Sequence, residues 1–214
     1  MTLESSKTLG GIGALLMFIG VFPYISFFGI IELVGLILVL AAVHGFADYY
    51  KEHAIFTNAL YAVIAGIVGA VIAVAVTVFT ILTSLTDFLH AIYPGWNGDW
   101  TTLQGLTPDT SNLNFQDLVP LLAGIVLVFI VAWVFAIIAA FFMRRSLRLI
   151  SAKSGVGLFS TTGLLLLIGA VLVIFGIGAV LIWIAALILA IAFFTMKPAE
   201  PPAPTAAYSP PTPV

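Results

Sequence analysis

One carboxylate, Glu32, lies well inside an apolar segment of the sequence. A charge at membrane depth costs about 2.5 kcal/mol or more, so Glu32 is a candidate ion, proton or substrate site. The other interpretation is structural: a protonated or hydrogen-bonded carboxyl that holds helices together, or one that reaches water at the outer interface. Thr77, Thr80 and Ser84 share a helical face at a similar predicted depth and would complete a polar pocket with Glu32.

Three arginines, Arg144, Arg145 and Arg148, follow an apolar run closely. They are candidate contacts for anionic lipid headgroups, or simply the signal that fixes membrane topology. His44 and Asp48 lie four residues apart, a spacing that allows a shared proton, although an interfacial pair beside two tyrosines is the ordinary explanation.

No motif commits the chain to a reaction. No calcium-loop spacing is found among Asp87, Asp99, Asp109 and Asp117, and zinc-protease, phosphate-loop and nucleophile-elbow patterns are missing from the sequence. Cysteine is absent, and the net charge of -2 is too small to indicate a partner. We therefore expect no enzyme, no cofactor, no metal site and no nucleic-acid partner.

The elements that carry these residues must be membrane helices. Hydrophobic residues make up 62% of the chain and charged residues 7%, with a mean hydropathy of +1.24, whereas soluble domains carry about 25% charged residues. The apolar runs do not alternate in polarity, so they predict helices and not a barrel. We expect an all-α polytopic helix bundle with about six transmembrane helices.

The predicted transmembrane domain covers 1–196, with an outer loop over 87–117 whose turn signals allow a small hairpin. Residues 197–214 are rich in proline and predict a disordered cytoplasmic tail. The expected helices are about 9–26, 28–47, 54–86, 118–143, 158–175 and 178–196. Gly176 and Gly178 are the turn candidates between the last two, and Asn114 with Asp117 resembles a helix-start cap.

Every lysine and arginine falls on one side of a six-helix arrangement, and these residues are Lys7, Lys51, Arg144, Arg145, Arg148, Lys153 and Lys197. Basic residues near helix ends stay cytoplasmic, which predicts cytoplasmic N- and C-termini and an extracellular loop 87–117. The first hairpin also aligns with the last, by chance between apolar sequences or by an ancestral duplication that would give a parallel repeat.

The segments Leu3–Gly13, Ala47–Tyr50, Ile55–Tyr61, Phe141–Arg145 and Ala192–Phe194 resemble an archaeal family of multi-pass membrane proteins. That family is catalogued as domain of unknown function number 996. The resemblance implies an archaeal plasma membrane and supplies no activity or site residue.

Two hypotheses about function follow. The first is a non-enzymatic scaffold or accessory subunit that contacts membrane lipids and forms a homo-oligomer or binds a membrane-protein partner. The alternative is a small transporter or channel that uses Glu32 as its intramembrane site.

Overall fold

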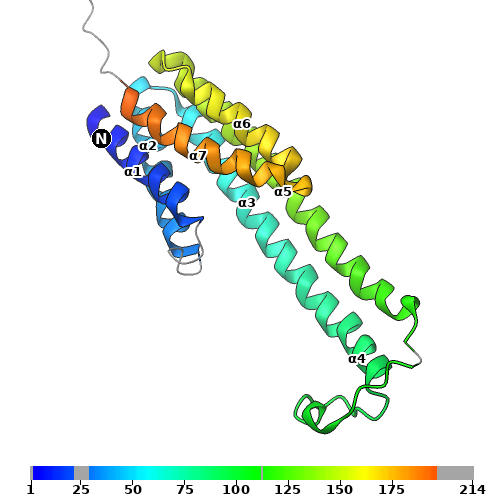
Figure 1. Cartoon of the computed structure of the whole chain (residues 1–214). Helices are drawn as coiled ribbons and strands as arrows, with labels where there is room; N and C mark the ends of the chain where they lie inside the picture. The colour runs from blue at the N-terminus through cyan, green and yellow to red at the C-terminus, as the bar shows by residue number, and fades with distance from the viewer. Residues whose placement is uncertain (1, 22–28, 112, 197–214) are drawn as a thin grey trace, which may run out of the picture. The chain divides into compact units, whose positions relative to one another are not determined.

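The computed structural model describes residues 2–21, 29–111 and 113–196, whose regular elements are helices, with no strand among them. The chain is all-α, as predicted from its sequence (Figure 1). The predicted tail and most of the first interhelical turn lie outside the described residues. The helices are α1 (Leu3–Gly20), α2 (Ile30–Tyr50), α3 (His53–Thr80), α4 (Thr86–Ile92), α5 (Phe115–Ser154), α6 (Leu158–Leu172) and α7 (Ile177–Thr195).

Five helical spans among the described residues are long and apolar enough to cross a membrane. They are Ile30–Tyr50, His53–Ile92, Phe115–Ser154, Leu158–Phe175 and Ile177–Thr195. The remaining long helix, α1, begins at Leu3 because the Thr2 hydroxyl caps it by accepting the Ser5 N–H. Its first two turns carry Glu4 and Lys7, so its apolar part is shorter than that of the other five.

The described residues group into two compact units. Unit 1 comprises the described parts of Met1–Phe56, Leu147–Thr162 and Ala186–Val214. Unit 2 comprises the described parts of Thr57–Ser146 and Gly163–Ala185.

Unit 1 is built on the α1–α2 hairpin. The two backbones approach closely where both helices carry glycine, since a β-carbon on Gly13 would lie 2.6 Å from the carbonyl oxygen of Gly35. Three fully buried rings form an aromatic core beside this hairpin. Phe193 of α7 stacks on Phe46 at 5.8 Å and meets Phe159 edge-on at 5.1 Å.

Unit 2 is built on a long antiparallel pair of helices, residues 57–92 and 115–146, which we call the arm (Figure 1). The complete spans His53–Ile92 and Phe115–Ser154 each have 40 residues, or about 60 Å at 1.5 Å per residue. The two helices pair through ring and small-residue contacts at successive levels: Tyr61 with Phe142, Gly69 with Phe135, and Thr80 with Gly124.

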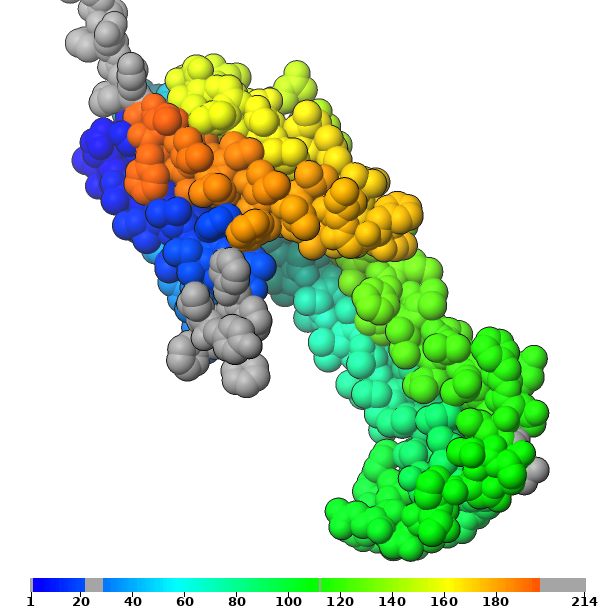
Figure 2. Space-filling view, viewed as in Figure 1, coloured from blue at the N-terminus to red at the C-terminus, as the bar shows by residue number. Residues whose placement is uncertain are grey.

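The end of α6 lies against the arm at Trp133, whose indole N–H donates to the carbonyls of Ala170 and Val171 at 3.1 and 3.2 Å, just before the α6–α7 turn. Gly176 makes this turn with a φ of 77°, a conformation that glycine adopts without steric cost. Figure 2 shows the surface of the arm in teal and green.

The helix ends of the arm differ from those expected over 54–86 and 118–143. The first helix passes through a π-helical turn, Ile81–Leu85, and ends at Ile92. The second begins at Phe115, where the Asn114 N–H donates to the Asp117 carboxylate at 2.9 Å, and it runs past the arginines to Ser154. Hydropathy predicts where an apolar segment ends. The helix itself continues beyond that point, because charged residues such as arginine and lysine favour helical structure.

The loop that joins the arm's helices contains a single 3-10 turn, Leu103–Gly105, and no strand in 93–111 or 113–114, so the hairpin that the turn signals allow is not formed there. Instead the loop folds around Trp96, which is 4% exposed and donates its indole N–H to the Asp99 carbonyl at 2.7 Å. The Trp96 ring contacts His90 of α4 at 4.8 Å and Trp100 at 5.3 Å.

Candidate functional site

Glu32 lies in the first turn of α2, where Gly29 precedes the helix with a φ of 84°. The dipole of a helix N-terminus favours an acidic side chain in the first turn. The half-buried side chain lies against α1, because a β-carbon on Gly20 would be 2.7 Å from the Glu32 carboxyl carbon. Glycine at position 20 therefore makes room for the carboxyl group inside the hairpin.

The three hydroxyl residues predicted to accompany Glu32 all lie on the arm, but in different surroundings. Thr77 is exposed and donates to the Ala73 carbonyl at 2.8 Å. Thr80 is buried against Gly124, and Ser84 is half-buried in the π-helical turn. Glu32 belongs to unit 1 and the three hydroxyl residues to unit 2, so the pocket that would join them stays a prediction.

Two of the three predicted arginine contacts are exposed on α5. Arg145 and Arg148 are exposed, while Arg144 is half-buried with its backbone next to Gly163 of α6. A β-carbon on Gly163 would lie 3.0 Å from the Arg144 Cα atom, so α6 passes close to α5 at this level.

His44 and Asp48 form the pair that their spacing predicts, with Nε2 3.6 Å from Oδ2 and both side chains about half exposed. The His44 ring also meets Phe56 edge-on at 4.7 Å. This exposed position supports the interpretation of the two residues as an interfacial pair.

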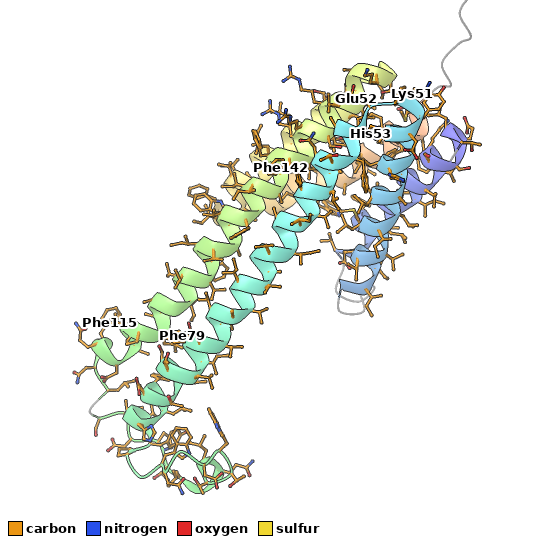
Figure 3. All side chains as sticks on the ribbon, turned by 180° about the vertical axis from the view of Figure 1, so that it is seen from behind. Lys51, Glu52, His53, Phe79, Phe115 and Phe142 are labelled. Carbon is orange, nitrogen blue, oxygen red and sulfur yellow. The ribbon has the colours of Figure 1, made fainter. Side chains whose placement is uncertain are left out.

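An ion pair between Glu52 and Lys153 could not be predicted from the sequence. Glu52 lies in the short connection between α2 and α3, which Figure 3 labels at Lys51, Glu52 and His53. Its Oε2 atom is 3.4 Å from Nζ of Lys153, near the end of α5. The only signal in the sequence is opposite charge in two loops that the basic-residue pattern places on one side.

The outer loop is held by aspartates that bond within it. The N–H and hydroxyl of Thr101 both donate to Asp99, and these bonds lower the pKa of the Asp99 carboxyl. The hydroxyl and N–H of Ser111 lower the pKa of Asp109 in the same way. Both carboxylates act as local turn caps, a role typical of aspartate in loops.

Apolar helical spans joined by short connections, with one ordered polar loop, define an α-helical multi-pass membrane protein. The chain belongs to the family described as "Protein of unknown function (DUF996)", which matches residues 31–187. The family assignment agrees with the resemblance noted in the sequence.

An uncharacterized protein of Methanocaldococcus jannaschii is 28% identical to this chain over 196 residues, covering 92% of this chain and 94% of its own length. The two proteins are therefore similar across nearly all of both chains. No solved structure matches this chain.

Proposed function

We propose that the protein is a non-enzymatic scaffold or accessory subunit of a membrane assembly, and that the Phe115 end of the arm is its contact surface. The observation that carries this proposal is the exposure of the arm. Phe115 is 69% exposed, and the chain itself buries no residue of α5 from 115 to 145.

The length of the arm supports a protein partner. The apolar stretch from Leu118 to Met143 is about 39 Å long, whereas the hydrocarbon core of a bilayer is about 30 Å thick. Counted from the arginines, about 20 residues of α5 are enough to cross the hydrocarbon core of the bilayer. In an arm that stands perpendicular to the membrane, the Phe115 end therefore lies beyond that core. Apolar surface outside the hydrocarbon is stabilised by contact with protein.

We further propose that both termini face the cytoplasm and that loop 87–117 is extracellular. Contacts within unit 1 support a location on the same side of the membrane for four segments: the start of α1, the α2–α3 connection, the end of α5 and the end of α7. Glu52–Lys153 links the α2–α3 connection to the end of α5, and a β-carbon on Gly10 of α1 would meet the Phe193 ring of α7. The aspartates of the outer loop are bonded to uncharged groups within that loop. Such a loop suits the side of the membrane that lacks basic residues.

A photo-crosslinking residue at Phe115 tests the scaffold proposal in native membranes. Figure 3 labels Phe115 at the loop end of the arm and Phe142 toward the other end. We expect one discrete protein adduct at position 115, either a second copy or one partner, and only lipid adducts at the control position Phe141, which is 53% exposed. Lipid adducts alone at both positions, with a monomer in mild detergent, would indicate a tilted arm covered by lipid and contradict the proposal.

A further inference from the structure

The exposed face of α5 changes from apolar to cationic at one point. Val134, Ile138 and Phe141 are 43%, 38% and 53% exposed, and they follow one another at helical spacing. The next two positions on the same stripe are Arg145 and Arg148, both exposed. Since α5 is continuous here, the exposed apolar stripe reaches both arginines within about two turns of Phe141.

The arginines have no counter-ion among the described residues. Lys7 is 3.9 Å from Glu4 and Lys153 is 3.4 Å from Glu52, but no ion pair involves Arg144, Arg145 or Arg148 in that part of the chain. Glu4, Asp48 and Glu52 already face a lysine or histidine. At the far end of α5, Asp117 is about 40 Å away along the helix.

We propose that Arg145 and Arg148 bind the phosphate of an anionic phospholipid headgroup, with Arg144 beside them. A guanidinium presents a planar fork of donors that matches phosphate oxygens, and it is more weakly hydrated than an ammonium group. Position on the lipid-facing stripe commits the site to a headgroup, because a phosphate at this level is attached to acyl chains that pack along Phe141 and Ile138. The inference does not depend on the scaffold role or on which partner the arm contacts.

Full-length protein in mild detergent tests this site by native mass spectrometry and thermal unfolding. The probes are phosphatidylglycerol, phosphatidylcholine and inorganic phosphate. We expect retention of phosphatidylglycerol with an increase in the unfolding temperature, and neither effect with the other two probes. The variant Arg145→Gln/Arg148→Gln should bind phosphatidylglycerol roughly 25-fold more weakly, about fivefold for each charge near the surface.

Two further variants separate a phosphate site from general charge. Arg145→Lys/Arg148→Lys keeps both charges and should still lose part of the affinity, because lysine lacks the planar fork. Lys7→Gln removes a cation that already faces Glu4 and should bind like the unsubstituted protein. Equal retention by the glutamine variant, unchanged affinity in the lysine variant, or the same stabilisation by inorganic phosphate alone would each overturn the proposal.

Discussion

The Glu52 carboxylate lies 3.4 Å from the Lys153 ammonium group and so joins the α2–α3 connection to the end of α5. The side chains of Lys153 and Glu52 are 44% and 35% exposed. Water therefore screens the attraction between the two charges. The ion pair contributes to stability only as much as a surface ion pair does.

Glu52→Gln or Lys153→Gln should each lower the free energy of unfolding by about 0.5 kcal/mol, with the effect decreasing at high salt. The measurement is a double-mutant cycle on thermal unfolding in detergent. The exchanged variant Glu52→Lys/Lys153→Glu should recover most of the loss. A cost above about 3 kcal/mol for either single variant would mean that the pair is desolvated.

Gly13→Ala should destabilise unit 1 by about 1–3 kcal/mol, because the new β-carbon would meet the Gly35 backbone, which cannot move aside as a flexible side chain can. Gly66→Ala is the matched control, since a β-carbon at Gly66 of α3 would meet no atom within 4 Å. The control should be neutral or stabilising by about 0.5–1 kcal/mol. Equal unfolding temperatures for the two variants would contradict the close approach of α1 and α2.

Glu32→Gln separates the two hypotheses about function. The scaffold role predicts a folded protein with the same adduct at position 115, because glutamine keeps the shape of the side chain beside Gly20. The transporter alternative predicts loss of ion or proton flux, measured in proteoliposomes with an entrapped pH-sensitive dye. Flux in the unsubstituted protein that disappears in Glu32→Gln would replace the scaffold role with the alternative.

Acid should loosen the outer loop. The pKa of Asp99 is lower in the folded loop than in an unfolded chain because Thr101 donates to its carboxylate. The stabilisation is therefore complete above the ordinary aspartate pKa of about 3.9 and is lost as pH falls through the lower folded value. Fluorescence of Trp96, which donates to the Asp99 carbonyl, should shift toward the red in that acidic range. Asp99→Asn should weaken this dependence, and an unchanged profile in that variant would rule out Asp99 as the cause.

Much of the fold is predictable because apolar runs that do not alternate in polarity can span lipid only as helices. The α6–α7 turn at Gly176 was also predictable, since few other residues in this apolar run could end a helix. The end of α5 was not, because hydropathy falls at Arg144 while Leu147 and Ile150, both fully buried, continue the helix into the core of unit 1.

The candidate sites were less predictable than the fold. Sequence identifies Glu32 by its apolar surroundings, but its place at the start of α2 and against Gly20 depends on where the helix begins. The Glu52–Lys153 pair joins residues far apart in the chain, so only the folded arrangement brings them together. The sequence also identifies the arginines as candidates. The exposed stripe that leads to Arg145 can be recognised only when the exposure of each residue of α5 is known.

The threading of the chain through the membrane is tested most directly by single cysteines in a protein that has none of its own. The exposed Ala152 serves as the inner position and the exposed Thr110 as the outer one. A membrane-impermeant maleimide should label Thr110→Cys in intact cells and Ala152→Cys only after permeabilisation. Labelling of Ala152→Cys in intact cells, with Thr110→Cys protected, would contradict the proposed topology.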